Sequence, residues 1–86
     1  MIKSELIRIL DAVADLSQKD VKKEVLETEI VSQSKLSGIE VRNHLNELEW
    51  LHLVKESALP RPSHEEFRLW NITEKGLQEL IRQNSK

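Results

Sequence analysis

The chain has 86 residues, of which 38% are apolar and 33% are charged, and it contains no cysteine. This length suffices for one domain over residues 1–86 and leaves no room for a second hydrophobic core. The absence of cysteine excludes disulfides, thiol chemistry and thiolate metal sites. No apolar run approaches the ~20 residues that span a bilayer. Charges also begin too early for a signal peptide, so a cytoplasmic location without membrane contact is expected.

The net charge of −2, from 13 Lys and Arg against 15 Asp and Glu, bears on nucleic-acid binding. Dedicated DNA-binding domains more often carry a basic patch and a high isoelectric point. Here the charges are mixed along the chain, and neither end forms a basic arm. This balance makes DNA binding a weaker expectation without excluding it, because a local basic patch suffices.

The first predicted element is a helix over residues 2–16. Apolar side chains recur there at spacings of three and four, which places them on one helical face: Ile2, Leu6, Ile9, Leu10, Val13 and Leu16. Residues 17–20 predict a break, and residues 20–24 predict a turn or a short helix. Val25 and Leu26 then predict a short strand.

Two short helices joined by a turn follow. Thr28 is predicted to cap a helix that ends near Ser34, and residues 35–36 form the turn. Ser37 and Glu40 have the spacing of a capping box, in which each side chain satisfies a free amide at the start of a helix. The helix that begins there runs to about residue 48 and buries Val41, Leu45 and Leu48.

A hairpin and a last helix complete the chain. Strands are predicted over residues 53–59 and 66–72, and the loop 60–65 between them contains two prolines, which do not donate to a sheet ladder. Thr73 is predicted to cap the last helix. Its inner face is predicted to consist of Leu77, Leu80 and Ile81.

The order helix, helix, helix, hairpin, helix resembles a winged helix-turn-helix domain. Residues 41–48, residues 53–55 and the segment Ile72-Thr73-Glu74-Lys75-Gly76 are similar to MarR-like, ArsR-like and PadR-like transcriptional regulators. The resemblance implies a small α+β fold with a three-helix core, a two-stranded wing and a C-terminal helix. The chain departs from these families at His52, where they commonly place glycine, and His tolerates the left-handed backbone expected there. It also lacks the metal-sensing cysteines of ArsR-like proteins and the length for the dimerisation helices of MarR-like proteins.

The resemblance implies that the third helix enters the major groove of double-stranded DNA and that the wing lies over the backbone. Phosphate contacts are expected from Gln33, Ser34, Lys35 and Ser37, and base contacts from Gly38, Ile39, Arg42, Asn43 and Asn46. Further contacts are expected from the wing residues Arg61, His64 and Arg68. A homodimer is also expected, because one helix reads only a few base pairs. Glu40, Glu47 and Glu49 on the same helix oppose the approach of phosphate.

The alternative is a protein-interaction domain that does not bind DNA and contacts a protein partner through Ile39, Trp50, Phe67 and Leu69. Trp50 has two interpretations: an exposed contact residue, or a ring that folds over the wing strands at the end of the helix. An enzyme is not expected. His44, His52 and His64 lie scattered, without the spacing of metal ligands, and two glycines form no phosphate-binding loop, so no metal or cofactor is predicted.

Overall fold

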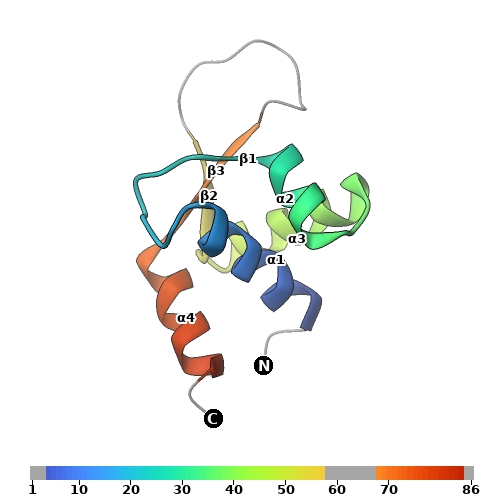
Figure 1. Cartoon of the computed structure of the whole chain (residues 1–86). Helices are drawn as coiled ribbons and strands as arrows, with labels where there is room; N and C mark the ends of the chain where they lie inside the picture. The colour runs from blue at the N-terminus through green and yellow to red at the C-terminus, as the bar shows by residue number, and fades with distance from the viewer. Residues whose placement is uncertain (1–3, 58–67, 85–86) are drawn as a thin grey trace.

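The computed structural model describes residues 4–57 and 68–84 and confirms the predicted order of elements (Figure 1). The elements are α1 (Ser4–Leu16), β1 (Val25–Leu26), α2 (Glu27–Ser34), α3 (Gly38–Trp50), β2 (Val54–Glu56), β3 (Leu69–Ile72) and α4 (Glu74–Asn84). Within these described ranges, four helices and a small sheet make the expected α+β winged helix-turn-helix fold. None of the described helices has the length and apolar character needed to cross a membrane.

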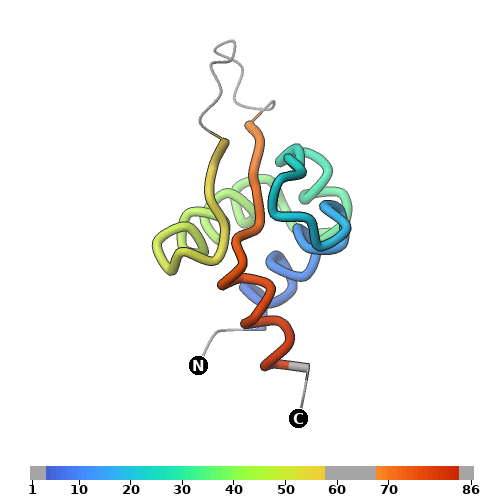
Figure 2. The backbone as a smooth tube through the Cα atoms, turned by 90° about the vertical axis from the view of Figure 1, so that its left-hand side faces the viewer, coloured from blue at the N-terminus to red at the C-terminus, as the bar shows by residue number. Residues whose placement is uncertain are grey.

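The three strands form one antiparallel sheet in the order β1-β3-β2. Trp70 of the central strand pairs with Val25 on one side and with Glu56 on the other. Strands β2 and β3 run side by side to the segment 58–67, and α1, α2 and α3 gather on one face of the sheet (Figure 2). The whole predicted loop 60–65 and the outer ends of both predicted strands lie outside the described residues.

The core forms where α1 packs against the other three helices and the central strand. Side chains on the predicted stripes of α1 and α3 are fully buried there, together with two residues of β3: Ile9, Leu10, Val13, Val41, Leu45, Leu48, Trp70 and Ile72. Burying apolar surface is the main favourable contribution to the stability of such a domain. The two predicted helical faces are therefore confirmed, except at Ile2, which lies outside the described residues.

Two predictions about helices are wrong. Helix α2 begins at Glu27 and not after Thr28, because the backbone N–H of Glu27 donates to Arg68 O at 2.9 Å and fixes the helix start beside β3. Ile81 is 68% exposed, because α4 packs on α1 mainly through Leu77 and Leu80. The cap of α4 is as predicted, with the Gly76 amide donating to Thr73 Oγ1 at 3.0 Å.

Candidate nucleic-acid interface

Helices α2 and α3 form a helix-turn-helix with a tight connection. Lys35 has a left-handed backbone (φ 63°), and its amide donates to Val31 O at 3.1 Å, which ends α2. The predicted capping box then starts α3: the Glu40 amide donates to Ser37 Oγ at 3.2 Å, and the Ser37 amide donates to Glu40 Oε1 at 3.3 Å. These bonds satisfy backbone groups that a helix start otherwise leaves free.

The outward face of α3 is exposed along its whole length. Ile39 is 77% exposed and Trp50 is 81% exposed, and Asn43 and Asn46 lie exposed between them. Neither asparagine side chain bonds to any other residue within the described part of the chain. The predicted outward face is therefore confirmed. The interpretation in which Trp50 folds over the wing strands is wrong, because its ring remains in solvent.

Arg42, predicted to contact DNA, is held inside the domain. Its Nε and Nη2 atoms donate to Glu27 Oε2 at 3.2 and 3.0 Å, and its side chain is half-buried. Glu27 is only 5% exposed, so this ion pair is largely shielded from water. A contact between Arg42 and DNA would have to compete with a charge-assisted bond of this kind.

The residues predicted to bind phosphates differ in their exposure and in the hydrogen bonds that their side chains make. Ser34 is buried, donates from Oγ to Val31 O at 3.3 Å and accepts from the Leu36 amide at 3.3 Å, so it stabilises the turn. Gln33 is exposed and donates to Asp15 Oδ2 at 2.8 Å. Lys35, Ser37 and Gly38 are exposed, which leaves Lys35 as the cation of the turn.

The wing residues are described only in part. Arg61, His64 and Phe67 lie outside the described residues. Arg68 donates to both carboxylate oxygens of Glu56 at 2.7 and 2.8 Å, and its guanidinium lies 5.3 Å from the centre of the Trp70 ring. Leu69 is half-buried in β3, so it is a weaker contact candidate than Trp50.

The electrostatics of α3 are acidic, as expected. Glu40, Glu47 and Glu49 are all exposed, and the charge of Arg42 is balanced by Glu27. Since duplex DNA is bound largely by neutralising phosphates, this helix attracts the backbone weakly. Among the described residues, no group of three or more His, Asp or Glu side chains is placed to bind a metal ion.

Two histidines have local backbone roles. His52 has a left-handed backbone (φ 64°) just after α3, which confirms the expected helix-ending conformation. The His44 ring bonds through Nδ1 to Glu40 O within its own helix.

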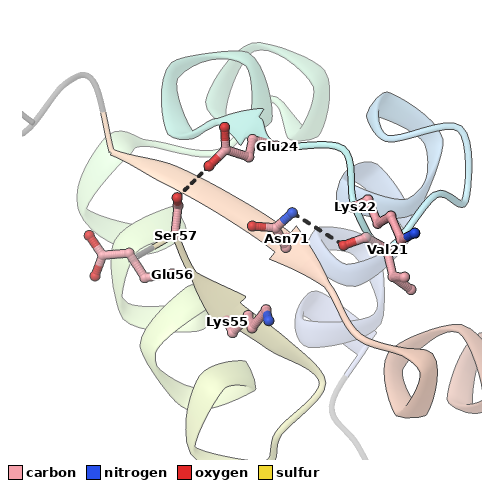
Figure 3. Close-up of a pocket in the computed structure, with 7 residues that line it drawn as sticks. All are labelled: Val21, Lys22, Glu24, Lys55, Glu56, Ser57 and Asn71. Carbon is pink, nitrogen blue, oxygen red and sulfur yellow. Dashed lines mark hydrogen bonds between the residues drawn. The ribbon is translucent and has the colours of Figure 1, made fainter. Parts of the chain in front are cut away.

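A polar hollow lies on the face of the sheet away from the helix-turn-helix (Figure 3). It lies between the turn before β1 and the strands β2 and β3. Its polar groups are partly paired with one another: Ser57 Oγ donates to Glu24, and Asn71 Nδ2 donates to Val21 O at 3.2 Å. Sequence reasoning did not identify this hollow, because its residues come from three separate segments.

Comparison with known proteins supports the fold. No protein-family model and no curated protein matches the sequence. Among solved structures, BpsR of Bordetella bronchiseptica is similar with a TM-score of 0.76 and 16% identity, over 95% of this chain and 56% of that one. MepR of S. aureus in complex with DNA is similar with a TM-score of 0.75 and 18% identity, over 98% of this chain and 63% of that one. The zinc-responsive MarR family member ZitR of Lactococcus lactis is similar with a TM-score of 0.72 and 23% identity, over 96% of this chain and 51% of that one.

The chain thus spans little more than half the length of the proteins it resembles. Their identities to this chain are low, whereas the shared geometry extends over nearly all of it. The chain has the winged helix-turn-helix fold of MarR-family transcriptional regulators.

Proposed function

We propose that this chain binds double-stranded DNA as the DNA-binding domain of a transcriptional regulator, with α3 in the major groove. The observation that carries the proposal is the exposed face of Ile39, Asn43 and Asn46 on the second helix of a helix-turn-helix. The similarity in fold to MepR, which was solved in complex with DNA, supports this choice of partner.

The residue types on this face suit base recognition. An asparagine amide makes a bidentate pair with adenine, and an aliphatic side chain contacts the methyl group of thymine. Asn43 and Asn46 are therefore proposed to read adenine, and Ile39 to read thymine. Lys35 and Ser37, at the turn, are proposed to contact phosphates and fix the position of α3.

The acidic residues of α3 imply that one domain binds weakly. Glu47 and Glu49 repel phosphates, so a further cation must come from the predicted wing residue Arg61. A homodimer is proposed as well, because two linked domains bind two half-sites with an effective affinity above that of either one.

A salt-dependent binding experiment tests the phosphate contacts. Anisotropy of a labelled duplex is measured over a range of salt concentrations for the native chain and for Lys35→Gln. The variant should weaken binding to all duplexes and reduce the salt slope by about one, as expected for loss of one phosphate contact. Lys75→Gln, which removes an exposed cation from α4, is the matched control and should leave the slope unchanged. Equal salt slopes for the two variants would mean that Lys35 does not contact phosphate.

A second experiment tests base reading. Asn43→Ala and Asn46→Ala should each reduce discrimination between a preferred duplex and one substituted base pair by about 1–3 kcal/mol. Non-specific binding at low salt should change little, because neither residue carries charge. If both variants discriminate as the native chain does, α3 does not read bases through these amides.

The second candidate function is protein interaction without DNA binding, favoured by the exposure of Trp50 and Ile39 on one face of α3. Exposed tryptophan often contributes much of the energy of a protein interface. Under this proposal Leu69 and Phe67 extend the contact, and Trp50→Ala abolishes self-association or partner binding while the domain stays folded. Retained DNA binding by Trp50→Ala with no change in oligomeric state would favour the first candidate.

A further inference from the structure

A buried carboxylate connects three elements of the domain. Glu27, the first residue of α2, accepts at Oε2 from Arg42 of α3, with Nε at 3.2 Å and Nη2 at 3.0 Å. Its other oxygen, Oε1, accepts from the indole Nε1 of Trp70 in β3 at 3.0 Å. One side chain therefore contacts both the candidate recognition helix and the central strand of the sheet.

The connection continues toward the wing. Trp70 is fully buried, and Arg68 lies over its ring. Arg68 forms a two-point ion pair with Glu56 of β2, and its carbonyl accepts from the Glu27 amide at 2.9 Å. The chain of bonds thus runs from α3 through Glu27 to both strands that lead into the segment 58–67.

Stability alone is a poor explanation for this arrangement. Burying two charges costs desolvation free energy, and well-packed apolar side chains in place of a buried ion pair are often equally or more stabilising. An ion pair also constrains the relative orientation of its groups, since the donors must lie at hydrogen-bonding distance from one carboxylate. Here the donors that meet at Glu27 come from α3 and β3, so the carboxylate fixes how these two elements lie relative to each other.

We infer that Glu27 is a positioning residue that holds the recognition helix in a fixed orientation to the wing strands. Arg42 then acts on DNA only through Glu27, and not as a base or phosphate contact. The consequence for DNA affinity rests on the proposed function, whereas the coupling between α3 and β3 is a property of the free domain.

The free domain is tested first, by NMR of the two tryptophan indoles. Arg42→Met removes both bonds from Arg42 to Glu27 without touching Trp70. The expected result is a shift of the Trp70 indole resonance and exchange with solvent at least about tenfold faster for amides of both α3 and β3. The exposed Trp50 indole is the internal reference and should not move. A folded variant whose Trp70 resonance and β3 exchange match the native chain overturns the inference.

DNA binding separates positioning from direct contact. If Glu27 positions α3, then Glu27→Gln and Arg42→Met both weaken duplex binding about tenfold, and neither changes the salt slope. If Arg42 contacts a phosphate, Arg42→Met reduces the slope by about one, whereas Glu27→Gln releases Arg42 and strengthens binding. This second pattern overturns the inference.

Glu47→Gln is the matched control for charge. It removes one carboxylate from the exposed surface of α3, and its side chain makes no hydrogen bond or ion pair within the described residues. Positioning predicts that it binds DNA as well as or better than the native chain, in contrast to Glu27→Gln. A loss of affinity equal to that of Glu27→Gln would overturn the inference, because loss of charge alone would then explain both variants.

Two further outcomes remain interpretable. If Arg42→Met does not fold, Glu27→Gln carries the test, since glutamine keeps an oxygen for the Trp70 indole and buries no charge. If the native chain binds no duplex under any condition, the proposed function fails, but the indole and exchange measurements still decide whether Glu27 couples α3 to β3.

Discussion

Gly76→Ala should destabilise the domain, although alanine favours a helix more than glycine does. Gly76 lies in the first turn of α4, at the base of the wing strands. A Cβ atom there would lie 2.3 Å from the carbonyl oxygen of Leu53 and 3.0 Å from Cγ1 of Ile72. The carbonyl has little freedom to retreat, because it accepts from the amide of Thr73 at 3.2 Å and from its hydroxyl at 3.0 Å.

The change in the free energy of unfolding is the sum of opposing contributions. Replacing glycine by alanine in a helix gains up to about 1 kcal/mol, and overpacking a tight contact costs about 1–3 kcal/mol. Losing the bonds from Thr73 to Leu53 adds about 1 kcal/mol for each bond. The net loss is about 3 kcal/mol, which lowers the melting temperature by about 15 °C for a domain of this size.

Urea unfolding followed by circular dichroism measures this difference, and Gly38→Ala is the matched control. Gly38 begins α3, and no heavy atom lies within 4 Å of the position that an added Cβ atom would occupy there. That variant should be neutral or more stable by up to about 1 kcal/mol, since it gains helix propensity without a clash. If Gly76→Ala is as stable as the native chain, the close approach between α4 and Leu53 does not hold in solution.

Three further substitutions have distinct expected effects. Ser37→Ala removes the capping box of α3 and should lower the free energy of unfolding by about 1 kcal/mol in urea. His52→Gly should raise that free energy by about 0.5–1 kcal/mol, because it relieves a left-handed backbone; His52→Ala, which keeps the strain, should not. Trp50→Ala should change it by less than about 0.5 kcal/mol, because the ring is exposed; an unfolded variant would contradict that exposure.

The fold was largely predictable, because the signals that define it are local or periodic. The stripe of Val41, Leu45 and Leu48 follows the 3.6-residue repeat, and the Ser37 cap connects residues only three apart. The two failures have a common reason. The start of α2 and the exposure of Ile81 depend on which other elements lie alongside, and no pattern within the helix itself reports this.

The candidate site was predictable only in its outward geometry. A helical projection places Asn43 and Asn46 opposite the core, and the structure agrees. The same projection gives no partner for Arg42, because Glu27 precedes it by 15 residues and belongs to another helix. Arg68 likewise pairs with a residue 12 positions away, across the strands β2 and β3. The sequence therefore predicts Arg42 and Arg68 as DNA contacts, although both form ion pairs within the domain.

These ion pairs change what can be expected of DNA binding. Arg42 and Arg68 are balanced by carboxylates, so within the described part of the chain Lys35 is the cation of the helix-turn-helix with no such partner. A small number of phosphate contacts gives a shallow dependence of affinity on salt. Base contacts by Asn43 and Asn46 do not depend on charge, so discrimination between sequences should persist at salt concentrations that suppress non-specific binding. A steep salt dependence without sequence discrimination would instead show that several cations outside α3 bind the phosphates, and that Asn43 and Asn46 do not read bases.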